Sequence, residues 1–150
     1  MWLVKEKVHD DILLLHGDLI FDQNLLTKLI NEQRGNYVLV NNFISPPEKD
    51  FKSRIKDGYV KKISVKLKGD GVFFLAPFYR ITRNDFLQWL NKIDEYVEKN
   101  ELNYYAEDAL NEILDDVKLL PLFYKKEICM EIDSEEDLFE ARKLLRNSIS

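Results

Sequence analysis

The stretch Ile12-Leu13-Leu14-Leu15-His16-Gly17-Asp18 decides how the rest of the chain is interpreted. Four consecutive apolar residues predict a strand buried on both faces, which is typical of a parallel strand in an α/β sheet. Asp18 directly follows the predicted strand end at His16-Gly17. Ligands of open α/β sheets bind beyond the carboxyl ends of strands, where a carboxylate suits a divalent cation. The alternative is that Asp18 only satisfies the backbone of a turn, as aspartate often does.

The residues after this stretch predict a βαβ unit. A helix is expected from an N-cap at Asp22 to about Gln33, followed by Gly35 as a C-cap. Its apolar residues at helical spacing are Leu25, Leu26, Leu29 and Ile30. A second buried strand over residues 37–40 then follows, and a strand-helix-strand order at this spacing favours two parallel strands.

Further downstream the sequence predicts a hairpin, a third buried strand, three helices and two short strands. Asp57-Gly58 is a strong hairpin turn, and the strand over residues 72–76 is expected to stop at Pro77. The last helix begins after Ser134 and turns Leu138, Ala141 and Leu145 to the core. The other predicted elements are helices over 82–99 and 106–115 and strands over 122–124 and 128–130.

Size and composition predict one ordinary globular domain over residues 1–150. Hydrophobic residues make up 45% of the chain and charged residues 33%. No apolar run reaches the roughly 20 residues that span a bilayer, and no secretory signal is visible. Cys129 is the single cysteine, so we expect a cytoplasmic protein without an internal disulfide. The net charge of −5 argues against a nucleic-acid partner.

Charge is distributed unevenly along the chain. Eight lysines and arginines lie between Lys49 and Lys68, and nine acidic residues lie between Asp94 and Asp116. Such runs are usually solvated faces. The functional alternative is that the basic hairpin contacts a phosphate-bearing ligand while the carboxylates contact a metal or an amine.

Two acidic motifs are candidates for chemistry. In the extended segment Glu131-Ile132-Asp133 both carboxylates point to the same side, and with Asp18 they would make an oxygen-rich Mg²⁺ site. The alternative is that Asp133 or Ser134 merely caps the following helix.

Tyr105, Glu107 and Asp108 open the acidic helix, where an aromatic face with carboxylates suits an ammonium group. The alternative is that these carboxylates are there only because the positive end of the helix dipole stabilises negative charge. His16 is interpreted as a strand-end residue, because no second histidine stands at ligand spacing.

Three stretches taken in order resemble sugar-phosphate-type nucleotidyltransferases, nearest to choline-phosphate and aminoethylphosphonate cytidylyltransferase-like enzymes. They are residues 15–22, 105–111 and 130–138. The resemblance extends from about Asp11 to Leu145, and this stretch is similar to the C-terminal part of these enzymes. It implies a partial Rossmann-like fold, a mixed sheet flanked by helices that lacks the first βαβ part.

The resemblance also implies a chemistry. A phosphate or phosphonate oxygen of a small acceptor attacks the α-phosphorus of a nucleoside triphosphate, with CTP as the expected nucleotide, and pyrophosphate leaves. Asp18 and Asp133 match the metal-binding carboxylates of these enzymes, with Glu131 beside them. Tyr105, Glu107 and Asp108 would lie near the acceptor, and Lys61, Lys62 or Lys66 would reach a phosphate. The expected cofactor is Mg²⁺.

One feature departs from the pattern of these enzymes. The residues before Asp18 contain no glycine-rich, arginine-containing loop of the kind that holds the triphosphate. We therefore expect a fragment with little activity alone, or a partner chain that supplies the N-terminal half. Two alternatives remain: a degenerate interaction or regulatory domain, and a metal-dependent glycosyltransferase. The latter usually uses Asp-x-Asp, which Asp18-Leu19-Ile20 does not provide.

Overall fold

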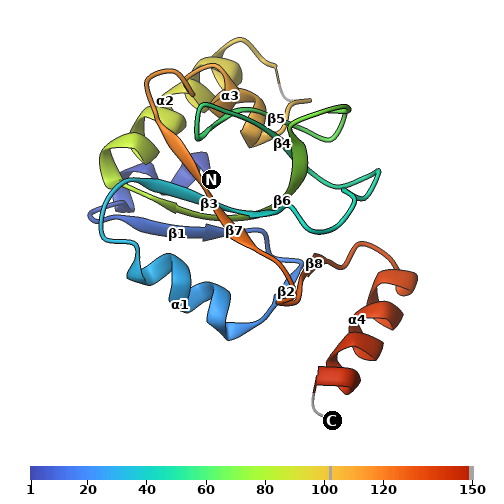
Figure 1. Cartoon of the computed structure of the whole chain (residues 1–150). Coiled ribbons are helices and arrows are strands. Elements are labelled where there is room, and N and C mark those ends of the chain that lie inside the picture. The colour runs from blue at the N-terminus through green and yellow to red at the C-terminus, as the bar shows by residue number, and fades with distance from the viewer. Residues whose placement is uncertain (102, 149–150) are drawn as a thin grey trace.

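The longest strand, β6 (Val72–Ile81), runs through the sheet and organises the fold (Figure 1). The structure, a computed structural model of the chain, describes residues 1–101 and 103–148. The other elements are η1 (Trp2–Lys7), β1 (Ile12–Leu15), β2 (Leu19–Phe21), α1 (Gln23–Asn31), β3 (Asn36–Asn41), β4 (Lys52–Lys56), β5 (Tyr59–Ser64), α2 (Arg83–Glu98), α3 (Ala106–Asn111), β7 (Leu119–Tyr124), β8 (Cys129–Glu131) and α4 (Glu135–Ser148).

Six strands form a mixed sheet in the order β5-β4-β6-β3-β7, with β1 also paired to β6. Among the described strands of this sheet, only β3 and β7 are parallel neighbours; the other pairs are antiparallel. On the side of β6 away from β3, β4 pairs with residues 72–74 and β1 pairs with residues 78–81. The two strands therefore lie end to end, with an interval of β6 between them. A separate antiparallel pair joins β2 to β8.

Alternation along the central strands sends side chains to two apolar cores. Val38, Leu75 and Tyr79 point to the core that includes Trp89 of α2 and Leu110 of α3. Leu39, Phe74, Ala76 and Phe78 point to the core that includes Leu25 and Leu29 of α1. Figure 1 accordingly has α1 on one side of the sheet and α2 and α3 on the other. The predicted α/β class, with a mixed sheet flanked by helices, is confirmed.

The predicted burial and pairing of residues 12–15 were wrong. β1 is antiparallel to β6 and, among the described residues, pairs with no other strand. Leu13 and Leu15 are 36% and 38% exposed, whereas Ile12 and Leu14 pack on a core. β1 and β3 do run in the same direction, because both are antiparallel to β6, but β6 separates them. An apolar run identifies a strand without identifying its neighbours.

The expected end of the third strand at Pro77 was also wrong. β6 continues to Ile81, and its pairing with β3 shifts between Val38 and Leu39, opposite Tyr79 and Ala76. Pro77 falls within this irregularity, where a missing N–H group costs no ladder hydrogen bond.

Most local signals gave the correct element. The hairpin turns at Asp57 and Gly58, which both have positive φ (53° and 80°), and Thr82 caps α2 by accepting a hydrogen bond from the Asp85 N–H. Two details differ: α3 ends at Asn111 rather than near 115, and Ile30 is exposed instead of facing the core. Ile30 lies beyond the stripe of α1 that packs on the sheet, which consists of Leu25 and Leu29.

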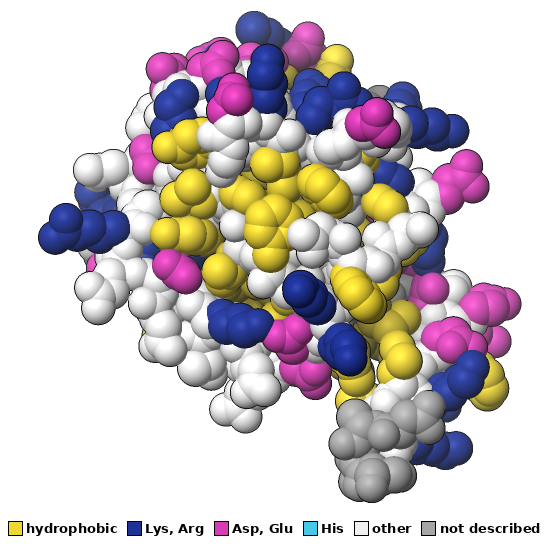
Figure 2. All heavy atoms as spheres, viewed as in Figure 1, with side chains coloured by type: hydrophobic (Ala, Val, Ile, Leu, Met, Phe, Trp, Pro, Cys, Tyr) yellow, Lys and Arg dark blue, Asp and Glu magenta, His cyan; other side chains and the backbone are white. Residues whose placement is uncertain are grey.

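The C-terminal helix α4 stands away from the sheet in Figure 1. Ala141 is buried, as predicted, but Leu138 and Leu145 are each more than one third exposed. Figure 2 shows apolar side chains gathered in the middle of one face and on the region of α4, with charged side chains around them. Among the described residues, no helix has the length and apolar character that a membrane crossing requires.

Candidate functional site

The candidate site lies beside the interval of β6 that separates β1 from β4. The backbone N–H of His16 donates to the Pro77 carbonyl over 3.2 Å, and the backbone N–H of Leu75 donates to the Phe51 carbonyl over 3.0 Å. The residue after β1 and the residue before β4 are thus fixed by two residues of β6, Pro77 and Leu75, that are two positions apart. Their rings make an edge contact with centroids 6.0 Å apart.

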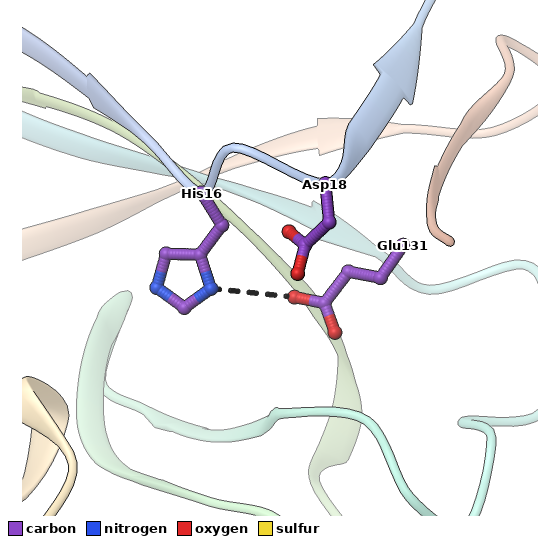
Figure 3. A group of neighbouring side chains, drawn as sticks. All are labelled: His16, Asp18 and Glu131. Carbon is purple, nitrogen blue, oxygen red and sulfur yellow. Dashed lines mark ion pairs between the residues drawn. The ribbon is translucent and has the colours of Figure 1, made fainter. Parts of the chain in front are cut away.

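The β2–β8 pair brings the predicted acidic residues to the same place. Leu19 pairs with Glu131, and the Ile132 N–H donates to the Asp18 carbonyl over 3.0 Å. Ligand atoms of His16, Asp18 and Glu131 lie within 4.8 Å of one another (Figure 3). A second group, Asp50, Glu131 and Asp133, meets the same limit. Asp18 and Asp133, which are distant in sequence, are therefore both neighbours of Glu131; their role as cation ligands stays a prediction.

His16 lies between two carboxylates. Its Nε2 is 3.4 Å from Glu107 Oε1, and its Nδ1 is 3.6 Å from Glu131 Oε1. The neighbouring carboxylate of Glu107, and then that of Glu131, raise the pKa of His16 to about 10 against the opposing effect of burial. The imidazole is therefore cationic at neutral pH and acts as a counter-charge, which the interpretation as a plain strand-end residue missed.

Glu107 of α3 is almost completely buried, with 2% of its surface exposed. The Tyr79 hydroxyl donates to Glu107 Oε1 over 3.1 Å, so this carboxylate links the core to His16. Burial, together with the nearby Glu107 charge, raises the pKa of Tyr79 well above its usual value, so the hydroxyl keeps its proton. Glu107 lies three residues before Leu110, on the buried face of α3. A glutamate at such a position indicates that a polar or charged partner lies nearby.

Tyr105 and Asp108 have different surroundings from Glu107. The Tyr105 ring makes an edge contact with Phe51, with centroids 5.1 Å apart, while more than half of the residue stays exposed. The Asp108 carboxylate accepts the Tyr105 N–H over 3.0 Å in a capping box, so its structural role is to cap α3. Of the three candidates on this segment, two contact residues of the site: Tyr105 contacts Phe51, and Glu107 contacts His16.

The two candidate lysines lie apart from the carboxylate groups. Lys61 of β5 is 3.4 Å from Asp115, and Lys66 follows β5 in a turn beside a cavity of about 670 Å³. The cavity is lined by Pro46, Glu48, Lys52, Val65, Lys66, Leu67, Lys68, Gly69 and Val72. None of the carboxylates grouped around Glu131 lines it. Their assignment as phosphate contacts stays a prediction.

Lys49 and Asp50 were not identified from the sequence. Lys49 Nζ lies 2.6 Å from Asp137 and 3.5 Å from Asp133. The hydrogen bond with Lys49, followed by that with Ser134, lowers the pKa of Asp137 to about 2. No local pattern could have identified either residue, because their position depends on where β4 begins relative to β1.

Comparison with solved structures shows a nucleotidyltransferase-like fold. A protein assigned as a glucose-1-phosphate thymidylyltransferase from Bacillus anthracis matches 97% of this chain at 19% identity with a TM-score of 0.74. The inositol-1-phosphate CTP transferase of T. maritima matches 97% at 18% identity with a TM-score of 0.71. CTP:phosphocholine cytidylyltransferase from Streptococcus pneumoniae matches 96% at 16% identity with a TM-score of 0.78.

The chain spans about three fifths of each of these proteins: 58%, 59% and 61% of their lengths, respectively. No family model matches the sequence, and neither does any curated protein. The likeness therefore establishes the fold of the chain as part of a nucleotidyltransferase-like fold.

Proposed function

We propose that this chain forms the cation- and acceptor-binding part of a nucleotidyltransferase that transfers a cytidylyl group from CTP to a small phosphate or phosphonate acceptor. The observation that carries the proposal is that Glu131 belongs to two groups of neighbouring ligand atoms, one with His16 and Asp18 and one with Asp50 and Asp133. Two of these carboxylates come from segments more than 100 residues apart, so their meeting is a property of the tertiary structure.

The donor set fits a hard divalent cation. Glu131 Oε1 is buried and accepts no hydrogen bond among the described residues, although it is 3.6 Å from His16 Nδ1. Carboxylate oxygens are the ligands that Mg²⁺ prefers. Asp18, Glu131 and Asp133 would hold the ion, which would neutralise charge on the phosphates of the nucleotide during transfer.

The protein side chains would orient the acceptor and balance charge. Phe51 and Tyr105 present an aromatic edge next to the acidic group, a surface that suits the ammonium end of an acceptor such as phosphocholine. Cationic His16, held by Glu107, would limit repulsion between Glu131 and the other carboxylates. The acceptor oxygen would form a bond to the α-phosphorus while the bond to pyrophosphate breaks, a reaction that depends on positioning and electrostatics.

We further propose that turnover requires the rest of the fold, joined to this chain or supplied by another polypeptide. The chain spans 58–61% of the length of the three solved transferases. A non-catalytic interaction domain is the second candidate, favoured by the unpaired outer edge of β1 among the described residues.

The test is CMP transfer from radiolabelled CTP to phosphocholine or 2-aminoethylphosphonate with Mg²⁺. The chain is assayed alone and together with the polypeptide encoded next to it. We expect activity in the completed protein, and a loss on the order of 10²-fold or more for Asp18→Asn. Asp70→Asn, in an exposed turn, is the matched control. An inactive mixture, or equal activity of Asp18→Asn and wild type, would reject the proposal in favour of the interaction domain.

A further inference from the structure

Asp50 is a buried carboxylate that the proposed chemistry does not use. Only 7% of its surface is exposed, and its Oδ1 atom is buried without a hydrogen-bond donor among the described residues. An unpartnered buried acceptor of this kind costs roughly 1–3 kcal/mol, and more when it is charged. Such a group needs either a proton or a cation.

The neighbouring lysines do not neutralise Asp50. Lys52 Nζ donates to the backbone carbonyls of Glu48, Asp50 and Val65 over 2.8–2.9 Å, so its ammonium group is used by main-chain acceptors. Lys49 extends to Asp137 and Asp133 and is half exposed. The Asp50 side chain forms no ion pair within the described part of the chain, although a lysine stands on its N-terminal side and another two residues beyond it.

The group around Asp50 has the dimensions of a cation site. Ligand oxygens of Asp50, Glu131 and Asp133 all lie within 4.8 Å of one another. Two oxygens on opposite sides of one ion are separated by about twice the metal–oxygen distance, which is about 4.1 Å for Mg²⁺ and about 4.6–5.2 Å for Ca²⁺. Glu131 Oε1 is also buried without a hydrogen-bond donor among the described residues, but it pairs with His16 Nδ1 over 3.6 Å, so the inference depends on Asp50 Oδ1.

We propose that Asp50, Glu131 and Asp133 bind a second divalent cation, adjacent to the one assigned to Asp18 and sharing Glu131 and Asp133 with it. The inference extends the proposed function, but cation binding is measured without turnover, so each can fail separately. Phe51 fixes the position of Asp50, since its carbonyl accepts the Leu75 N–H and its ring lies against His16. The Asp50 carboxylate therefore reaches the group from the segment just before β4, while Glu131 and Asp133 reach it from β8 and the segment that follows.

Burial of Asp50, followed by the charge of Glu131, raises the pKa of the Asp50 carboxyl. The competing occupant of the group is thus a proton on Asp50, which would satisfy the carboxyl without any metal. These two states differ in what happens when the acid is replaced by an amide, because asparagine mimics the protonated acid but is a poor cation ligand.

The experiment is a Mn²⁺ titration of the full chain at pH 7, followed by electron paramagnetic resonance of the free ion, with Ca²⁺ as a second probe. We expect two Mn²⁺ equivalents, with affinities of roughly 0.1–1 mM or tighter. Asp50→Asn should weaken one equivalent at least tenfold and leave the other, which Asp18→Asn should remove instead. Asp70→Asn is the matched control, and the thermal midpoint of each variant without metal verifies that it folds.

Three results would overturn the inference. The first is unchanged Mn²⁺ binding in Asp50→Asn together with a raised thermal midpoint, which would identify Asp50 as a protonated structural carboxyl. The second is a single equivalent lost in both Asp50→Asn and Asp18→Asn, which would indicate one shared ion. The third is no Mn²⁺ binding by the wild-type chain. Loss of transfer activity with two intact equivalents would instead count against the proposed function alone.

Discussion

Glu107 connects the apolar core to the charged group at the surface. Its carboxylate accepts from the Tyr79 hydroxyl and lies 3.4 Å from His16, which in turn reaches Glu131. A buried carboxylate is tolerated only when its partners are in place, because an unpaired charge in the interior is strongly unfavourable. Glu107 is therefore expected to govern both the position of His16 and local stability.

Replacing Glu107 with alanine should lower the free energy of unfolding by roughly 2–4 kcal/mol, because the Tyr79 hydroxyl then lies buried without an acceptor and His16 loses its main partner. Glu107→Gln keeps an acceptor for Tyr79 and should cost less. Urea unfolding followed by tryptophan fluorescence measures both. Glu98→Gln, at an exposed position of α2, is the control, and equal stabilities of Glu107→Ala and this control would contradict the role assigned to the pair.

Glu127 provides a pH-dependent contact between α1 and the β7–β8 turn. Its carboxylate pairs with Lys28 and accepts the N–H groups of Lys125 and Lys126. The Lys28 hydrogen bond is the main cause that lowers the pKa of Glu127 to about 2, from 4.5. A depressed pKa in the folded state means that the stabilisation is present above about pH 4.5 and is lost as the pH falls toward 2.

We expect Lys28→Met to be less stable than wild type by up to about 1 kcal/mol at pH 7, a value limited by partial solvent exposure of the pair. The difference should shrink toward zero near pH 2. Urea unfolding of both proteins at pH 7, 4 and 2.5 gives the comparison. A difference that does not depend on pH would show that Lys28 acts through packing of its methylene groups rather than through its charge.

At the scale of elements, the sheet ends at β5 because α3 covers that edge. The Asn111 side chain donates to the Ile63 carbonyl and accepts the Ile63 N–H, each over 2.7 Å. A side-chain amide thus replaces the next strand for one residue of β5, which protects an edge that would otherwise be open to other chains.

Asn111→Ala should destabilise the chain by roughly 2 kcal/mol, because both backbone groups of buried Ile63 lose their partner. Amide hydrogen exchange at Ile63 should accelerate at the same time. Asn91→Ala, at an exposed position of α2, should change stability by less than about 0.5 kcal/mol. Unaltered exchange at Ile63 in Asn111→Ala would argue against edge protection by α3.

At the level of the whole molecule, β1 has an edge that pairs with no strand among the described residues. It pairs only with β6 among the described residues, and Leu13 and Leu15 remain more than one third exposed. Open edges with apolar side chains favour association with a further strand. The same edge is therefore available to whatever completes the fold.

We expect the isolated chain to self-associate through β1 and Leu13→Lys to suppress this association, because a lysine on an edge strand opposes strand addition. Sedimentation velocity over a range of concentrations measures the effect. Leu3→Lys, in the highly exposed η1 segment, is the control for added charge. Equal suppression by both variants would assign the effect to net charge rather than to the edge of β1.

Local patterns in the chain were enough to predict most of the individual helices, strands and turns. Helical spacing in α1 and α2, the Thr82 cap and the Asp57-Gly58 turn depend on residues that are neighbours in the chain, so their geometry is readable from local patterns. The sequence also pointed to Asp18, Glu131 and Asp133, because a family resemblance favoured a cation site over their ordinary uses in turns and caps; their role as cation ligands stays a prediction.

The pairing of the strands and the contacts between charged side chains became known from the folded chain alone. The antiparallel pairing of β1 with β6, and the meeting of His16 with Glu107 and of Asp50 with Glu131, join segments many residues apart. These contacts are set by how two cores pack against the two faces of the sheet. Strand neighbours and buried charge pairs arise from such long-range packing, and no local pattern encodes them.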